Sequence, residues 1–129
     1  MLSLPDPARA LLDRPEHATI ASLEPSGQPQ LSVVWVKRDG DDVLFSTVRG
    51  RRKTDNLERD PRLTLLVFSA DDPYRYLEVR GSVTVEDDPD QALIEELSRK
   101  YLGKAYPWRN EDEKRVVVRL TPAKVVWYG

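Results

Sequence analysis

Residues 76–86, YLEVRGSVTVE, alternate strictly between two sets of side chains. One set is mainly apolar and consists of Leu77, Val79, Gly81, Val83 and Val85, and the other, mainly polar, of Tyr76, Glu78, Arg80, Ser82, Thr84 and Glu86. Successive side chains of a β-strand point to opposite faces, so this pattern predicts a strand with one buried face. Such a strand is stable only within a larger sheet, and the rest of the chain must therefore supply its partners.

Runs of apolar and β-branched residues predict those partners at residues 17–24, 31–38, 42–48 and 62–69, and in the C-terminal segments KRVVVRL and KVVWYG on either side of Pro122. Three helices are predicted, one from Asp6 to Pro15, one at about residues 52–59, and one between the cap residues Asp88 and Gly103. This order and its hairpin turns predict a mainly β fold, a single domain over residues 1–129: an antiparallel six- to seven-stranded β-barrel with short helices outside.

Composition excludes several classes of protein. The 129 residues include no cysteine and one histidine, His17, which excludes disulfides, thiolate metal sites and any metal site needing two imidazoles. A net charge of −2 gives no reason to expect nucleic-acid binding. No apolar run is long enough for a membrane span and the first residues do not resemble a signal peptide, so we expect a small cytoplasmic domain without membrane contact.

The predicted strands at residues 31–38 and 62–69 carry apolar side chains on both faces. A small barrel buries one face of each strand in its interior, which leaves the second apolar face to meet a helix or another subunit. Because a two-fold pair is the commonest way to cover such a surface, we expect a homodimer.

Basic side chains gather in FSTVRGRRKTDNLERDPR, residues 45–62, where a predicted strand ends and a predicted helix begins. A helix N-terminus presents unpaired N–H groups, and the clustered Arg49, Arg51, Arg52 and Lys53 would add charge for a phosphate. The hydroxyls of Ser46 and Thr54 and the amide of Asn56 could bond the same ligand. The alternative is a solvated basic face with local ion pairs.

A flat ring system could lie against the β-branched strand LSVVWV, residues 31–36, although the same pattern is typical of a core strand. Aromatic side chains at Tyr74 and Tyr76, Tyr106 and Trp108, or Trp127 and Tyr128 could stack on a ring or could pack in a core. His17 is interpreted as structural. The sequence has no GxGxxG, GxxxxGK[ST], HExxH or GxSxG motif and no carboxylate pair, so no catalytic residue and no metal ligand is identified.

The runs SGQPQLSVVWV, LFSTVRGRRKTDNLERDPRLTLLV and YLEVRGSVTV resemble the pyridoxamine 5′-phosphate oxidase-like split β-barrel superfamily. More narrowly they resemble its deazaflavin-dependent branch, whose members use coenzyme F420. The resemblance covers nearly the whole chain, and its most specific part is the Arg, Lys, Thr and Asn pattern before the LERDPR run. It implies an FMN-binding-like split barrel that dimerises, with a cofactor in each of two grooves between the subunits.

The resemblance also implies positions for the cofactor. Arg51, Lys53, Thr54 and Asn56 would hold the phosphate-bearing tail, with Ser46 and Thr47 beside it. The tricyclic ring would lie against Val33, Val34 and Trp35. Tyr74 and Tyr76 of the other subunit would close the groove.

The implied activity is transfer of a hydride from reduced coenzyme F420 to an unsaturated small-molecule acceptor. One alternative keeps the fold and uses FMN, because both cofactors carry a phosphate on a ribityl chain. Another is a flavin- or deazaflavin-binding protein without turnover. The acceptor cannot be assigned, since KAYPWRNEDE, residues 104–113, falls where substrate pockets differ within the superfamily.

Overall fold

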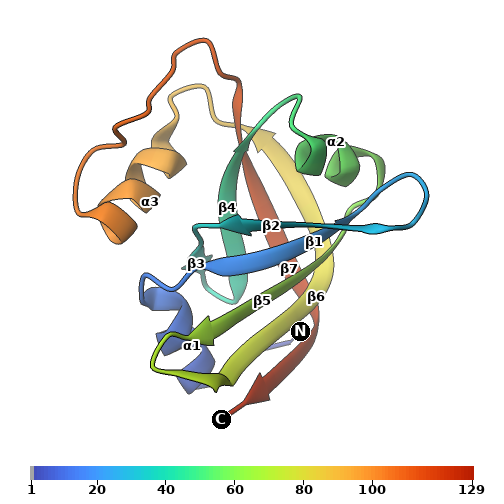
Figure 1. The fold of residues 1–129 in the computed structure, drawn as a ribbon, viewed down its shortest axis with the longest axis vertical. Helices are drawn as coiled ribbons and strands as arrows, with labels where there is room; N and C mark the ends of the chain where they lie inside the picture. Colours follow the sequence, from blue (N-terminus) through green and yellow to red (C-terminus); the bar gives the residue numbers. More distant parts are fainter. Residues whose placement is uncertain (1) are drawn as a thin grey trace.

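The computed structural model describes residues 2–129, which form one seven-stranded antiparallel sheet and three short helices (Figure 1). The helices are α1 (Asp6–Asp13), α2 (Arg52–Arg59) and α3 (Ala92–Leu102). The strands are β1 (Ala18–Leu23), β2 (Pro29–Val34), β3 (Lys37–Asp39), β4 (Asp42–Val48), β5 (Arg62–Ser69), β6 (Asp72–Asp87) and β7 (Arg115–Tyr128). The predicted mainly β organisation is confirmed.

The strands follow the order β2-β1-β5-β6-β7-β4-β3, so β2 and β3 form the two edges. Only Trp35 and Val36 connect these edges, so the Cα atoms of Val34 and Lys37 lie at most about 11 Å apart. The sheet therefore curls until its edges approach each other (Figure 1). Within residues 2–129 no strand pairing joins β2 to β3, so the predicted barrel is corrected to a curled, open sheet.

The predicted strand at residues 31–38 is interrupted where β2 ends and β3 begins. The Val36 amide donates to the Tyr101 hydroxyl at 3.1 Å, and the Val36 carbonyl accepts from Lys100 Nζ at 2.6 Å. Because α3 occupies both backbone groups of Val36, this residue cannot continue a strand ladder. The interruption thus depends on side chains about 65 positions away, which a local pattern cannot reveal.

The predicted break at Pro122 is absent, because β7 runs continuously from Arg115 to Tyr128. Its pairing with β6 shifts register between Arg80 and Gly81, which accommodates the proline in a bulge. Gly81 makes the bulge possible, since a Cβ built there would lie 2.0 Å from the Thr121 carbonyl oxygen.

The core lies on the inner face of the curled sheet and confirms the alternation of residues 76–86. Leu77 and Val79 have no exposed surface and Val83 is buried, whereas Arg80 and Thr84 are exposed. α1 adds Leu11 and Leu12 to the same core. None of the described helices is long and apolar enough to cross a membrane.

α2 and α3 lie toward one end of the sheet (Figure 1). Leu93 and Leu97 of α3 pack on Leu44 of β4, and Trp35 and Tyr101 pack against this second cluster. α3 begins at Ala92, later than the sequence suggests, but Asp88 still caps it by accepting from the Ala92 and Leu93 amides at 3.2 and 3.0 Å. Gly103 ends it in the left-handed conformation, as predicted.

Candidate functional site

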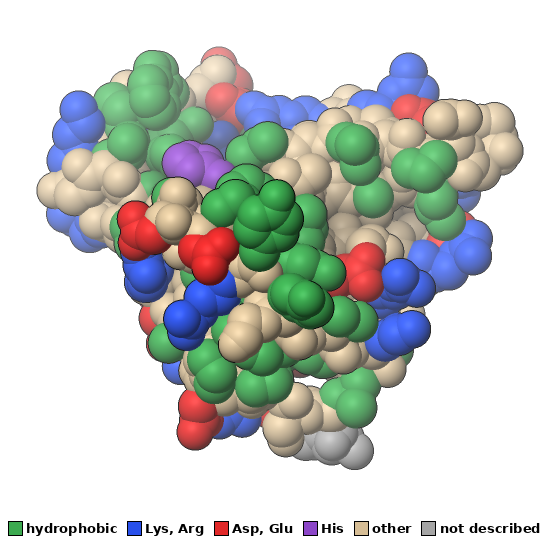
Figure 2. Space-filling view, turned by 60° about the horizontal axis from the view of Figure 1, so that its bottom comes forward, with side chains coloured by type: hydrophobic (Ala, Val, Ile, Leu, Met, Phe, Trp, Pro, Cys, Tyr) green, Lys and Arg blue, Asp and Glu red, His purple; other side chains and the backbone are tan. Residues whose placement is uncertain are grey.

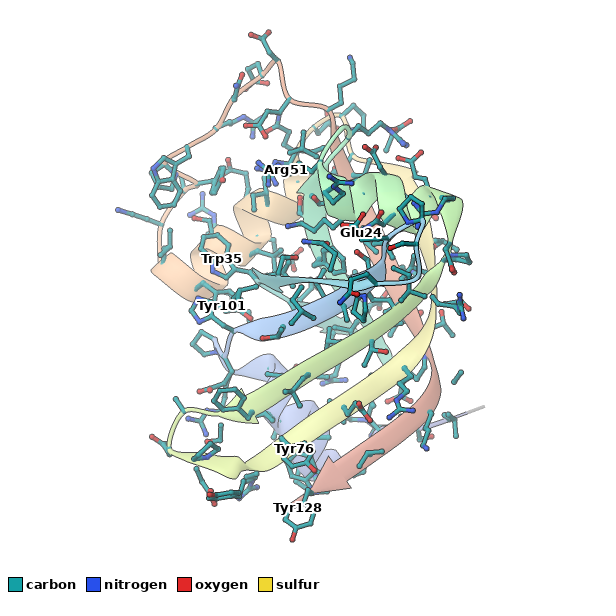
Figure 3. All side chains as sticks on the ribbon, turned by 45° about the vertical axis from the view of Figure 1, so that its right-hand side comes forward. Glu24, Trp35, Arg51, Tyr76, Tyr101 and Tyr128 are labelled. Atoms are coloured by element: carbon teal, nitrogen blue, oxygen red, sulfur yellow. The ribbon has the colours of Figure 1, made fainter. Side chains whose placement is uncertain are left out.

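A pocket lies where β2, β4, the start of α2, α3 and the segment after α3 meet. Figure 3 shows Arg51 and Trp35 on this side of the molecule. The residues that line the pocket come from seven separate parts of the chain: His17, Val33, Val34, Trp35, Ser46, Arg51, Lys53, Ile94, Leu97, Tyr106, Trp108 and Arg115. Among these described residues three are Lys or Arg and none is acidic, so the pocket favours an anion.

The basic end of the pocket is built around Lys53. Its ammonium is half-buried and lies 3.4 Å from Ser32 Oγ. Desolvation lowers the pKa of Lys53, and the nearby charges of Arg51 and Arg115 lower it further. Arg51 is the N-cap residue of α2, whose first-turn N–H groups have no acceptor within the helix. A phosphate here would meet three cations and the positive end of a helix.

The other end of the pocket is aromatic and apolar. The Trp35 indole stacks on the Tyr101 ring, and the Tyr106 ring meets Trp35 edge-on at 6.2 Å between centroids. Tyr106 in turn contacts Trp108, whose side chain is 63% exposed at the rim. Ile94 and Leu97 of α3 add aliphatic surface. Such a wall suits the face of a planar ring.

The two ends together fit a ligand that joins an anionic group to a flat apolar one. The pocket is open along β2, because Val33 lines it and is itself 62% exposed. Within residues 2–129 no group of three or more His, Asp or Glu side chains is arranged to hold a metal ion.

Comparison with known proteins gives the family. The profile of the pyridoxamine 5′-phosphate oxidase family matches residues 4–127, nearly the entire chain. This chain belongs to the pyridoxamine 5′-phosphate oxidase family.

Solved structures agree with that membership. The structure of an F420 reductase matches this one with a TM-score of 0.87 and 31% sequence identity. The match covers 95% of this chain and 98% of the reductase chain. A conserved hypothetical protein from Mycobacterium tuberculosis has a TM-score of 0.79 at 20% identity, covering 99% of this chain and 86% of its own. A pyridoxamine 5′-phosphate oxidase-related, FMN binding protein from Nostoc punctiforme has a TM-score of 0.63 at 14% identity, covering 96% and 84%. The last two share the fold.

The family fold brings six of the predicted cofactor-binding residues to one pocket: Val33, Val34, Trp35, Ser46, Arg51 and Lys53. These residues come from β2, from the connection to β3, from β4 and from the start of α2. The phosphate interpretation requires Arg51 and Lys53 to share a pocket, as they do, while Arg49 and Arg52 form the local ion pairs that a solvated basic face predicts. Val34 has a double role, because it is 7% exposed and also belongs to the main core.

Three other predicted residues, Thr47, Thr54 and Asn56, are not among the residues that line the pocket. Thr47, Thr54 and Asn56 are buried with at most 1% of their surface exposed. The Thr54 hydroxyl donates to the Val48 carbonyl at 2.8 Å and lies 3.2 Å from Thr47 Oγ1. Asn56 donates to Ser22 Oγ at 3.1 Å. These side chains therefore fasten α2 to β4 and β1, and their predicted part in holding the cofactor stays a prediction.

Tyr74 and Tyr76 lie away from the pocket of their own chain. Figure 3 shows Tyr76 beside Tyr128 at the opposite end of the sheet from Arg51. The Tyr76 and Tyr128 rings stack with centroids 5.6 Å apart, while Tyr74 is 77% exposed. Both tyrosines were expected to act from the other subunit, and that assignment stays a prediction.

The sequence did not identify Arg115 as part of the site, and His17 was interpreted as structural. Arg115 reaches the pocket because β7 pairs with β4, which places it opposite Val48. His17 reaches it because β1 begins beside α3, with its ring 5.4 Å from that of Tyr101. Tyr106 and Trp108 were considered as ring contacts, and both line the pocket. The local sequence around Arg115 gives no signal that would have identified it.

Proposed function

We propose that this protein is an oxidoreductase that uses reduced coenzyme F420 to transfer a hydride to an unsaturated small-molecule acceptor. The observation that carries the proposal is the pocket, which joins a basic anion-binding end to an aromatic wall. The F420 reductase, 31% identical over 95% of this chain, favours the deazaflavin over other cofactors that contain a ring and a phosphate.

In this proposal each part of the pocket has one task. Arg51 and Lys53 bind the phosphate of the cofactor, and the hydroxyl of Ser46, which lines the same pocket, adds a hydrogen bond. Val33, Val34 and Trp35 present an apolar wall to the ring and exclude water from it. The bound deazaflavin supplies the hydride chemistry, so the chain itself needs to bind and orient rather than to react.

The acceptor would contact the remaining wall of the pocket. Tyr106 and Trp108 belong to residues 104–113, the segment whose role the sequence left open, and they line the pocket together with Ile94 and Leu97 of α3. Such surroundings favour an acceptor with a flat, largely apolar part.

We also propose that the protein acts as a homodimer. An outer apolar face is exposed on β2, β5 and β7. It consists of Leu31, Val33, Leu66, Phe68 and Tyr128. Strand pairing makes it continuous, since Thr19 lies opposite both Val33 and Leu66, and Tyr76 opposite both Phe68 and Tyr128. Figure 2 shows hydrophobic side chains over much of the middle of one side of the molecule.

Val33 connects the outer apolar face to the pocket, because it belongs to both. A second copy that covered this face would therefore also close the open side of the pocket. Light scattering after size exclusion should give about twice 14.8 kDa for the native chain. Phe68→Glu should give a folded monomer, and a native monomer at micromolar concentration would contradict the proposal.

The test of the activity is a side-by-side titration of the apoprotein with oxidised coenzyme F420 and with FMN, followed by reduction of the cofactor that binds. Tighter binding of F420, and oxidation of its reduced form by an added quinone or enone, supports the proposal. Tighter binding of FMN with turnover identifies the FMN-dependent alternative. Binding without turnover across a panel of acceptors identifies a cofactor-binding protein that is not an enzyme.

A further inference from the structure

The Arg115 guanidinium is buried in the wall of the pocket, where it lies over the Tyr106 ring at 5.4 Å from the centroid and makes only long polar contacts with the described residues. Its side chain is 3% exposed, and its Nε has no hydrogen-bond partner among the described residues. Nη1 lies 3.4 Å from Ser46 Oγ and Nη2 lies 3.4 Å from Tyr106 Oη, and both of these acceptors are neutral hydroxyls at long range. Burying a permanently charged group in this way is costly unless an anion compensates it.

The nearest anion is the Glu113 carboxylate, and it is shared. Glu113 Oε2 lies 3.5 Å from Nη2 of Arg115 and 3.5 Å from Nη2 of Arg51. Both distances exceed the 2.7–2.9 Å of a strong charge-assisted bond, so neither arginine is bound tightly. One carboxylate therefore compensates two guanidinium groups, with Lys53 adding a third positive charge nearby.

Glu113 can leave this position without disturbing the fold. Its backbone is held by hydrogen bonds from its own amide to the Asn110 carbonyl at 3.2 Å and from Gln91 Nε2 to its carbonyl at 3.4 Å. Its side chain is 24% exposed and, among residues 2–129, makes only the two long ion pairs. Rotation of the side chain toward solvent would expose the donors of both arginines to the pocket.

We propose that Arg115 is an anion-binding residue of this pocket and that Glu113 is its exchangeable counter-ion, displaced by a phosphate or carboxylate group of the ligand. The proposal rests on the proposed function only in requiring that the pocket take an anionic ligand. Ser46 and Tyr106, which already face the guanidinium, would flank the same group.

The consequence is a competition between Glu113 and the ligand anion. Removing the Glu113 charge should tighten anion binding, because the ligand no longer has to displace a carboxylate. Removing the Arg115 charge should weaken it, because the pocket loses a donor that is already desolvated and in place. An ordinary surface carboxylate on the same segment should have no comparable effect.

The experiment measures inorganic pyrophosphate binding at fixed ionic strength by NMR titration. We expect Glu113→Gln to lower the dissociation constant about threefold or more, and Arg115→Gln to raise it about tenfold. The matched control is Glu111→Gln, two residues away, because Glu111 is 73% exposed and pairs with Arg109 at 2.6 Å, outside the pocket. Arg119→Gln controls for loss of an arginine from β7.

Equal dissociation constants for Glu113→Gln and Glu111→Gln would overturn the proposal, as would the absence of pyrophosphate binding in both the native chain and Glu113→Gln. If Arg115→Gln does not fold, the comparison of the two glutamate variants decides alone. A native chain that binds coenzyme F420 while Glu113→Gln behaves as its control overturns this inference and leaves the proposed function standing. If pyrophosphate binding changes as expected but neither coenzyme F420 nor FMN binds, this inference stands and the proposed function is overturned.

Discussion

The indole of Trp35 stacks on the ring of Tyr101, with centroids 5.3 Å apart and ring planes 13° apart. This contact joins the connection between β2 and β3 to the last turn of α3. The Tyr101 hydroxyl donates to the Glu16 carbonyl at 2.7 Å and accepts from the Val36 amide at 3.1 Å. One aromatic side chain of α3 therefore fixes both the backbone and the indole that form a wall of the pocket (Figure 3).

Tyr101→Phe should lower the free energy of unfolding by about 1–2 kcal/mol, because it leaves the Glu16 carbonyl and the Val36 amide without their partner. The ring stack should survive, and with it the near-ultraviolet circular dichroism of Trp35. Tyr101→Leu should lose that signal as well. Urea unfolding and circular dichroism check both variants, and an unchanged spectrum in Tyr101→Leu would mean that the stack does not hold Trp35.

Lys53→Ala should weaken the phosphate-bearing cofactor by about ten- to a hundredfold while leaving stability nearly unchanged, since it removes one charge-assisted bond. Arg51→Ala should act similarly. The matched control is Arg52→Ala, because Arg52 is 68% exposed and pairs with Glu24 at 3.1 Å, outside the pocket. Calorimetric titration compares the three, and equal affinities would mean that the basic segment is only a solvated surface.

Gly81→Ala should destabilise the fold by about 3 kcal/mol or more, because its Cβ would overlap the Thr121 carbonyl in the bulge of β7. Gly103→Ala is the comparison, since that glycine has a positive φ of 73° and open space around it. It should cost only the strain of the left-handed conformation, about 1 kcal/mol. Chemical denaturation of the two variants checks the difference, and a smaller loss at Gly81 would contradict the bulge geometry.

Lys100 should make the stability depend on pH above neutrality. Its pKa is lowered from 10.5 to about 8, mainly by burial; the charge of Asp13 opposes this shift and the charge of Lys37 adds to it. Between these values the unfolded chain keeps a proton that the folded chain has released, so the free energy of unfolding rises with pH. Because the side chain is only half-buried, we expect a rise of about 1 kcal/mol.

Lys100→Met removes the titrating group, and its unfolding free energy should lack that part of the rise between pH 8 and 10.5. The variant also loses the bonds from Nζ to the Leu12 and Val36 carbonyls, which lowers its stability at every pH. The difference in slope is therefore the measurement. Parallel curves for the two proteins would show that Lys100 titrates alike in the folded and unfolded chains.

The sequence by itself determined the elements whose signals are local. Alternation over residues 76–86 predicted the buried side of β6, because side-chain direction in a strand depends only on position along it. Gly103 marked the end of α3 for a similarly local reason. The basic cluster that contains Arg51 and Lys53 was found because a strand end, a helix start and charge coincide within a few positions.

Only the tertiary structure decided which distant residues meet. Pairing of β4 with β7 brings Arg115 beside Ser46, and docking of α3 brings Lys100 and Tyr101 against Val36, where they interrupt the predicted strand. The sequence predicted that the Asn56 amide bonds a phosphate. In the fold this amide is buried and donates to Ser22 Oγ. The physical reason is common to all of these contacts: they join residues more than 30 positions apart, and periodicity describes only neighbours along the chain.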